Sequence, residues 1–393
     1  KVTLTEPSLE HGGVSFQSSY YFGLLLNLKL KIPSRILMRL TSFSCRDFPK
    51  LYNKVKKFDW RPLIPHGPIQ WKVSTVESRL MVGKKIEETC QFAYKEYCEG
   101  NPEKKATDSF IPHVYLRMYR DQCTISLDTS GEHLHKRGYR THVSQAPLRE
   151  TLASVLWQWL KGREVKDRRI TLIDPMAGSG VLLFEALFEN FSLHMRNFSY
   201  ESFNNCPENI KSHNWKLLVN ADIPTLIHNV KAIDIDPLMT TAFQENIKVV
   251  QTYISRLKKA KITGVDQAEA FFQKQVTAET KDFATSPPEA IIADENWVIC
   301  NPPYGERIQT SGEKDYFTTL LVKIQNIYQP SRIGILLPDL PEIHALSNPT
   351  RWSTKNWKLA LKRKLSNGGL PTVFYRFDLA KEEPDEKTAR FDR

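Results

Sequence analysis

The stretch Thr171-Leu-Ile-Asp-Pro-Met-Ala-Gly-Ser-Gly-Val-Leu-Leu-Phe-Glu-Ala186 determines the fold that we expect for this chain. Its apolar start predicts a buried strand, its two glycines predict a tight turn, and the apolar run after them predicts a helix. Strand and helix patterns then alternate along the chain, at 230–233, 237–259, 297–300 and 333–337. This alternation is typical of a doubly wound, parallel α/β sheet. Before the first of these strands, Pro147 is well suited to begin a helix over residues 148–160.

The polar residues of this stretch predict what the turn binds. Asp174 stands at the carboxyl end of the strand, and Gly178 and Gly180 allow the backbone to approach a ligand closely. A carboxylate at this place would repel a pyrophosphate and attract a cationic amino or sulfonium group. We therefore expect S-adenosylmethionine, rather than a dinucleotide, as the cofactor.

A second acidic segment, Ala232-Ile-Asp-Ile-Asp-Pro237, follows the next apolar strand. A carboxylate at the end of that strand can hold both ribose hydroxyls of an adenosine. We assign this role to Asp234, because Asp236 directly precedes Pro237 and is well placed to cap the following helix. The distance from Gly178 exceeds the ~20 residues of a dinucleotide fingerprint. Residues 190–226 are therefore predicted to be an insertion.

The third motif, Trp297-Val-Ile-Cys-Asn-Pro-Pro-Tyr-Gly-Glu-Arg307, predicts the chemistry. An amino group conjugated to a base is a poor nucleophile, because its lone pair is delocalised into the ring. The side-chain oxygen of Asn301 and the carbonyl of Pro302 can accept its two hydrogens and direct the lone pair at a methyl sulfonium. Tyr304 offers a ring on which an unstacked base can rest. Cys300 is predicted to be a buried strand residue and not a nucleophile.

The composition excludes several classes of protein. Of the 393 residues, 41% are hydrophobic and 25% are charged, which is typical of globular domains and not of disordered or fibrous chains. The six cysteines form no Cys-x-x-Cys pair, so we expect no disulfide framework, no metal cluster and a reducing, cytoplasmic location. No apolar run approaches the ~20 residues that cross a membrane.

The net charge of +11 favours a polyanionic partner. Residues 31–61 carry nine Lys and Arg against two acids, and residues 351–364 carry six and no acid. Either run alone could be a solvated face, but two of them favour a nucleic-acid track. We expect contacts from Lys362 and Arg363 of the second run. Three further cations near Gly138 would either contact phosphate or orient the joint between domains: Lys136, Arg137 and Arg140.

The ends of the chain have a different organisation from its middle. Short β-rich runs at 14–16, 69–73 and 113–118 alternate with two helical candidates, at 20–39 and 82–99. This mixture predicts a small α+β module. Near the other end, Asn367-Gly368 between two β-rich runs predicts an antiparallel hairpin.

These motifs together resemble the THUMP-domain S-adenosylmethionine-dependent RNA methyltransferases. The resemblance is greatest to bacterial enzymes that methylate guanine N2 in large-subunit ribosomal RNA, a UPF0020-type family long described as N6-adenine-specific DNA methylases. The matching stretches cover most of the chain: 12–14, 26–28, 34–37, 128–140, 146–153, 174–180, 234–237 and 301–307.

The resemblance implies a domain order and a set of site residues. The domains would be a partial ferredoxin-like module (1–60), a THUMP RNA-binding domain (61–130), a joint (131–146), a class I methyltransferase domain (147–380) and a charged tail (381–393). The target base would be bound by Asn301, Pro302, Pro303 and Tyr304. The cofactor would be held by Asp174, Ala177, Gly178, Gly180 and Asp234, with Gln145 and Pro147 at its methionine end. Asp266 would either face the adenine amino group or be an exposed loop acid.

Other functions are compatible with the Asn301–Tyr304 turn. Adenine N6 in DNA is also a conjugated amine, and so is guanine N2 in transfer RNA, which makes both alternatives to ribosomal RNA. Methylation of a protein glutamine is disfavoured by the two basic runs, and a non-catalytic RNA-binding factor is disfavoured by the intact motifs. We expect a methyltransferase that acts on guanine N2 of ribosomal RNA.

Overall fold

The computed structural model describes residues 6–10, 12–64, 67–101, 111–141, 148–163, 168–191, 193, 195–211, 226–259, 265–291, 293–304 and 313–380. Its contacts divide the chain into two compact units. The first unit comprises Lys1–Arg137 and Arg196–Leu218, and the second comprises Gly138–Met195 and Val219–Arg393. Much of the predicted insertion after residue 190 therefore returns to the first unit.

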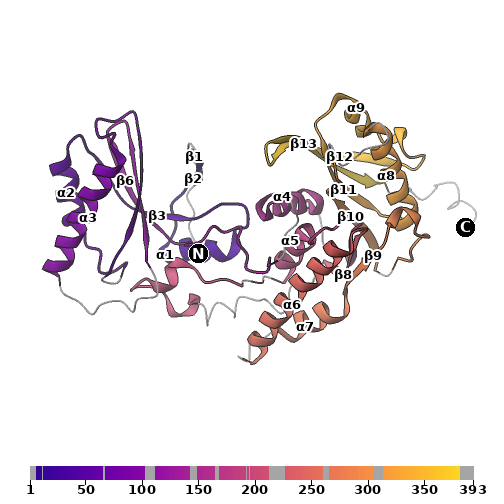
Figure 1. Ribbon diagram of the computed structural model, residues 1–393, viewed down its shortest axis with the longest axis horizontal. Helices are drawn as coiled ribbons and strands as arrows, with labels where there is room; N and C mark the ends of the chain where they lie inside the picture. The colour runs from indigo at the N-terminus through magenta and orange to yellow at the C-terminus, as the bar shows by residue number, and fades with distance from the viewer. Residues whose placement is uncertain are drawn as a thin grey trace, which may run out of the picture. The chain divides into compact units, whose positions relative to one another are not determined.

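The first unit contains a four-stranded sheet with the order β3-β6-β5-β4. In this sheet β4 and β5 are parallel and the other neighbours are antiparallel. Helices α2 and α3 lie on one face of the sheet (Figure 1), where the ring of Trp60 packs edge to face against Trp71 and Tyr94. The elements are β1 (Ser8–Glu10), β2 (Gly13–Ser15), α1 (Tyr20–Lys29), β3 (Leu37–Ser44), α2 (Phe48–Lys56), β4 (Gln70–Val76), α3 (Gly83–Gly100), β5 (His113–Tyr119) and β6 (Gln122–Asp128).

One helix of this unit is shorter than predicted. The helix expected over 20–39 ends at Lys29, and residues from Leu37 onward form β3 instead. Leu30 is already extended, and Pro33 follows, which disfavours helical backbone in the residue before it. The apolar residues after Pro33 therefore belong to a strand. The helix predicted over 82–99 is confirmed as α3.

The second unit contains a seven-stranded sheet with the order β12-β13-β11-β10-β7-β8-β9. The five strands from β11 to β9 are parallel, and β13 is antiparallel to both of its neighbours. The predicted doubly wound sheet and terminal hairpin are thus confirmed. The strands are β7 (Ile170–Asp174), β8 (Ile227–Asp234), β9 (Val276–Thr280), β10 (Glu295–Cys300), β11 (Arg332–Pro338), β12 (Trp357–Asn367) and β13 (Leu370–Leu379).

Helices cover both faces of this sheet, because alternate strand residues point to opposite cores. Leu172 and Trp297 belong to one core, with α4 to α7, whereas Ile173 and Val298 belong to the other, with α8 and α9 (Figure 1). The helices are α4 (Glu150–Lys161), α5 (Val181–Asn190), α6 (Pro237–Lys259), α7 (Val265–Lys274), α8 (Glu313–Tyr328) and α9 (Pro341–His344). Helix α4 starts at Glu150, two residues after the predicted start at Leu148, and Pro147 lies outside the described residues.

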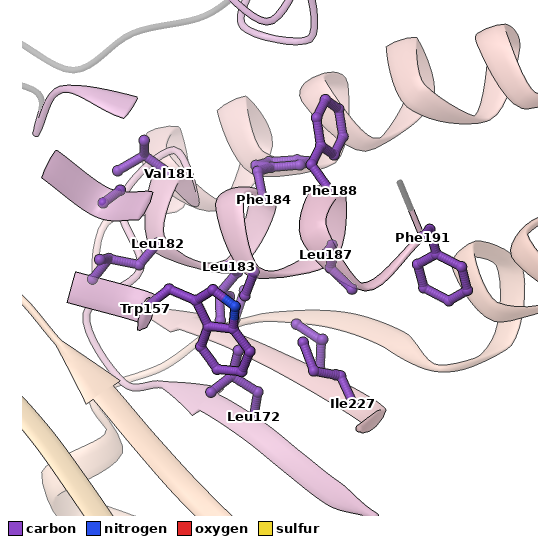
Figure 2. Packing of buried hydrophobic residues seen from close by; sticks show 14 of the residues in the cluster. Trp157, Leu172, Val181, Leu182, Leu183, Phe184, Leu187, Phe188, Phe191 and Ile227 are labelled. Atoms are coloured by element: carbon purple, nitrogen blue, oxygen red, sulfur yellow. The ribbon is translucent and has the colours of Figure 1, made fainter. Parts of the chain in front are cut away.

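Helix α5 is the centre of the larger core. Its residues from Val181 to Phe188 are all buried, as expected for a helix enclosed by other elements. All of them are apolar except Glu185, whose carboxylate accepts a hydrogen bond from the hydroxyl of Ser154 on α4. Figure 2 shows Trp157 of α4 and Leu172 of β7 beside it, with Phe184 projecting from its other side. The ring of Phe184 lies 5.3 Å from that of Phe243 on α6. This packing fixes the position at which α5 begins.

Candidate active site

The polar site lies at the carboxyl edge of the seven-stranded sheet. The chain leaves β7 toward β8 and β9 on one side, whereas β10 and β11 lie on the other, so the strand order reverses between β7 and β10. Ligands of open α/β sheets bind at this kind of reversal point. The register pairs Asp174 with Ala232, Asp234 with Thr280 and Ile173 with Val298. The ends of β7, β8, β9 and β10 therefore meet at one edge.

Asp174 is the buried carboxyl group of this site. It is 1% exposed, and its Oδ1 accepts a hydrogen bond of 3.1 Å from the backbone N–H of Met176. Burial raises the pKa of Asp174 to about 8, and the nearby carboxylate of Asp234 adds to the rise, against the effect of the Met176 N–H. The group is therefore largely protonated at neutral pH and would ionise on meeting a cation.

The turn after Asp174 is built around two glycines with positive φ. Gly178 has a φ of +54°, and no atom lies within 4 Å of the place where a Cβ would stand. Gly180 has a φ of +88°, and a Cβ there would lie 2.2 Å from the ring of Phe243. Gly178 thus leaves open space beside the turn, whereas Gly180 is required by conformation and by packing. Ala177 is 8% exposed, and its N–H donates to the carbonyl of Ile233 over 2.9 Å.

Asp234 links this turn to the start of α6. Its Oδ2 accepts from the N–H of Gly178 at 2.8 Å, and its Oδ1 accepts from the N–H of Asp236 at 2.9 Å. Each carboxylate oxygen keeps a further lone pair, so the group can still accept from two hydroxyls. The Oδ1 of Asp236 accepts from the N–H of Leu238 at 2.8 Å, which confirms the prediction that Asp236 caps α6.

The segment after β10 carries an unsatisfied acceptor. Asn301 follows Cys300 directly, and its Oδ1 is buried without a hydrogen-bond partner among the described residues. Buried polar atoms normally have partners, so this oxygen is a candidate to bind a ligand. Pro302 is buried and Pro303 is exposed. Tyr304 is half-buried against the core beneath α8, and its hydroxyl accepts from the Nδ2 of Asn367 at 2.6 Å.

Cys300 has the environment of a structural residue. It is 0% exposed, and burial raises the pKa of its thiol well above the usual value, with contributions from the charges of Asp174 and Asp234. The thiol therefore stays protonated and is a poor nucleophile.

The structure does not bring Asp266 to this edge, so its assignment to the adenine is corrected. Asp266 lies in the first turn of α7, its side chain is 83% exposed, and it pairs with Lys258 at 3.1 Å. Helix α6 runs from the carboxyl edge at Pro237 to Lys259, and at 1.5 Å per residue this carries the chain roughly 30 Å away. Asp266 is thus an exposed acid at the far end of α6.

The acid that does reach the edge is Asp282. The N–H of Lys281 donates to the carbonyl of Asp234 over 3.0 Å, which places Asp282 directly beyond the end of β9. Its Oδ1 accepts from the N–H of Ala284 at 2.9 Å. Strand β9 was not predicted from the sequence, because its largely exposed residues do not have the apolar pattern of the other strands. Ile235, between Asp234 and Asp236, is an apolar side chain at the same edge and is 68% exposed.

Two of the three cations near Gly138 are buried in the fold, so the first of their two expected roles, contact with phosphate, is wrong for both. Arg137 is 6% exposed and donates to the carbonyls of Leu134 and Lys31. Arg140 has an 11% exposed side chain, which pairs with Glu150 at 2.8 Å. Such groups order the backbone and are not available to a phosphate.

The other three predicted cations remain accessible. Lys136 has a 60% exposed side chain and pairs with Glu132, and Arg363 is exposed on β12. Lys362 lies over the ring of Tyr375, with its Nζ 5.5 Å from the centroid. Gln145, like Pro147, lies outside the described residues.

The described residues contain neither a metal-binding cluster nor a membrane-spanning helix. No group of three or more His, Cys, Asp and Glu side chains there could hold a metal ion. No helix in those parts of the chain is long and apolar enough to cross a lipid bilayer.

Known proteins are similar over nearly the whole chain. "Putative RNA methyltransferase YpsC" of Bacillus subtilis is 28% identical, over 97% of this chain and 92% of its own length. "Ribosomal RNA large subunit methyltransferase K/L" of Colwellia psychrerythraea is 25% identical over 94% of this chain, and the chain spans about half the length of that relative (51%).

A solved structure has the same fold. "SMU.472, a putative methyltransferase complexed with SAH" superposes with a TM-score of 0.69 at 22% identity, over 96% of this chain and 92% of its own. The predicted class I methyltransferase fold is thereby confirmed. The model of the family described as UPF0020, the RMKL-like methyltransferase domain, matches residues 137–358, more than half of the chain. The chain therefore belongs to the UPF0020 family of RMKL-like methyltransferase domains.

Proposed function

We propose that this chain is an S-adenosylmethionine-dependent RNA methyltransferase that methylates the exocyclic N2 of guanine in large-subunit ribosomal RNA. The observation that carries the proposal is the Oδ1 of Asn301, a buried acceptor with no partner among the described residues. It stands at the end of β10, at the edge that also holds Asp174. An acceptor in this place fits an amino group brought beside a cationic methyl donor.

The residues at this edge fit the cofactor. The buried Asp174 would meet the cationic amino-acid end, and the open space beside Gly178 would admit it. The free lone pairs of Asp234 would accept from the ribose hydroxyls. Asp282 and the exposed side chain of Ile235 would take the adenine edge and face.

When bound, the cofactor supplies a methyl group on a sulfonium, so that a nitrogen–carbon bond forms as the carbon–sulfur bond breaks, and S-adenosylhomocysteine and a proton are released. The chain supplies the orientation for this step. Asn301 Oδ1 and the Pro302 carbonyl accept the two hydrogens of the target amino group and hold its lone pair toward the methyl group. The ring of Tyr304 supports the base after it leaves its stack.

The choice of RNA as the substrate rests on charge and on the named relatives. Large-subunit ribosomal RNA is what the name of the Colwellia relative specifies, and the Bacillus relative is named for RNA. The first unit would be the RNA-binding module. The boundary expected at residue 60 divides its four-stranded sheet, because β3 pairs with β6, so its THUMP part would include β3 and α2 as well as residues 61–130. Lys136, Lys362 and Arg363 would contact phosphates, because all three are accessible.

The test is transfer of labelled methyl groups from S-adenosylmethionine to unmodified ribosomal RNA, transfer RNA and DNA, followed by nucleoside analysis. We expect N2-methylguanosine in ribosomal RNA. Asn301→Ala should abolish turnover and leave the cofactor Kd within about twofold, whereas Asn356→Ala, at an exposed position of the same unit, should retain activity. Label in DNA adenine or transfer RNA would refute the substrate. An active Asn301→Ala variant would refute the mechanism.

A further inference from the structure

The hairpin of β12 and β13 ends in a turn of fixed geometry. Asn367 pairs with Leu370, so the two residues between them, Gly368 and Gly369, form the whole connection. Their φ angles are +60° and +92°. Two positive φ angles are the mark of the type I′ turn, whose twist matches that of the flanking strands. The position of Asn367 is therefore set by the hairpin and not by a flexible loop.

The tip of this hairpin extends beyond the carboxyl edge of the sheet. Strand β13 pairs with β11 as far as Pro338 and Thr372, and the glycine turn lies three to four residues further on. At about 3.3 Å per residue, the tip lies roughly 10 Å past the end of β11. It thus projects at the same edge as the segment 301–304.

Contacts of Asp339, the residue after β11, hold the tip in place. The N–H of Asp339 donates to the carbonyl of Pro371 over 3.1 Å. The carboxylate of Asp339 pairs with Lys364 of β12 at 2.8 Å and with His344 at 2.6 Å. The hydrogen bond from Asn367 to Tyr304 therefore starts from a supported element.

The side chain of Asn367 fixes one end of the Tyr304 ring. Its Nδ2 donates to the Tyr304 hydroxyl at 2.6 Å, across 63 residues of sequence. Burial raises the pKa of this hydroxyl, so it stays neutral at physiological pH. The ring is held by the backbone of the 301–304 segment at one end and by the hairpin at the other. A ring held at both ends presents one face at one angle, which is what stacking of a base requires.

We propose that Asn367 is a positioning residue, which orients Tyr304 for the target base and makes the hairpin tip one wall of the base site. This inference rests on the proposed function, because it takes the ring of Tyr304 as the surface for the base. Asn367 itself acts through Tyr304. Loss of one hydrogen bond of this kind should lower kcat/KM about tenfold, which corresponds to ~1.4 kcal/mol.

The test is a double-mutant cycle measured as kcat/KM on ribosomal RNA. Asn367→Leu keeps the side-chain size and removes the donor, and Tyr304→Phe keeps the ring and removes the hydroxyl. Each should lower kcat/KM about tenfold, and the double variant should fall no further, because both remove the same bond. Asn367→Asp should keep kcat/KM close to that of wild type, in contrast to Asn367→Leu, since the Tyr304 O–H can donate to its carboxylate.

Two measurements separate positioning from folding. The Kd for S-adenosylhomocysteine and the thermal midpoint of Asn367→Leu should match those of Ser366→Ala, an exposed control in the same hairpin. Effects of Asn367→Leu and Tyr304→Phe that multiply in the double variant would overturn the inference, as would an Asn367→Leu variant within twofold of wild type. A wild-type protein that methylates no RNA would instead refute the proposed function.

Discussion

The buried carboxyl group of Asp174 makes the stability of this protein depend on pH in a direction that can be worked out. Its pKa is about 8 in the folded chain, against an ordinary value of 3.8. Between these two values the folded state keeps a proton that the unfolded state has lost. The free energy of unfolding must therefore decrease as pH rises through this window. Asp174→Asn removes the titration and should remove this decrease.

The size of the effect follows from the length of the window. One pH unit inside it is worth ~1.36 kcal/mol per proton, so from pH 5 to pH 8 the contribution is about 4 kcal/mol at most. We expect the stability advantage of Asp174→Asn over wild type to grow by roughly this amount between the two pH values. For a unit of this size, each kcal/mol corresponds to about 2–4 °C in thermal midpoint.

The assay is denaturant and thermal unfolding of both proteins without ligand, at several pH values from 5 to 8. Asp294→Asn is the matched control, because the side chain of Asp294 is 53% exposed. The affinity for S-adenosylmethionine should depend on pH in the opposite direction to the stability. Wild-type affinity should increase with pH as Asp174 ionises, and Asp174→Asn should bind weakly at every pH. Parallel stability profiles for wild type and Asp174→Asn would refute the reasoning.

Two further predictions concern the same edge. Gly180→Ala should destabilise the second unit by about 2–4 kcal/mol, measured by urea unfolding. The alanine would have to adopt a positive φ, and its Cβ would clash with the ring of Phe243 at 2.2 Å. A loss of stability below ~1 kcal/mol would contradict this packing. Asp282→Ala should weaken cofactor binding in calorimetry, whereas Asp266→Ala should leave the Kd unchanged, and the reverse result would restore Asp266 to the site.

The sequence was sufficient for the parts of the fold that repeat a local pattern. Buried strands such as β7 and β10 are continuous apolar runs, and α6 has a regular apolar face, so their types followed from periodicity. Strand β9 was missed because it lies at the sheet edge and is largely exposed. The end of α1 was misplaced because apolar residues continue past Pro33 into β3.

The candidate site was predictable where a residue directly follows a strand. Asp174, Asp234 and Asn301 each follow an apolar run, and parallel strands bring such positions to one edge. Roles that depend on tertiary partners were not predictable. Arg137 has the sequence context of a surface cation, yet it is buried and donates to backbone carbonyls. Asn367 is part of a plain turn signal, and its contact with Tyr304 exists only once the hairpin has paired with β11.

The carboxyl group of Asp174 and the Oδ1 of Asn301 both lower the stability of the chain without ligand, and this cost indicates how the site works. A buried carboxyl group with a raised pKa and a buried amide oxygen without a described partner both destabilise a folded chain without ligand. Asp174 becomes favourable when a cation arrives, and Asn301 when an N–H donor arrives, so each gains most from the ligand that it is expected to bind. Because the ends of β7 and β10 hold these two groups in place, little reorganisation is needed at the moment of transfer. The same groups should therefore lower the stability of the free protein and raise its affinity for donor and acceptor together.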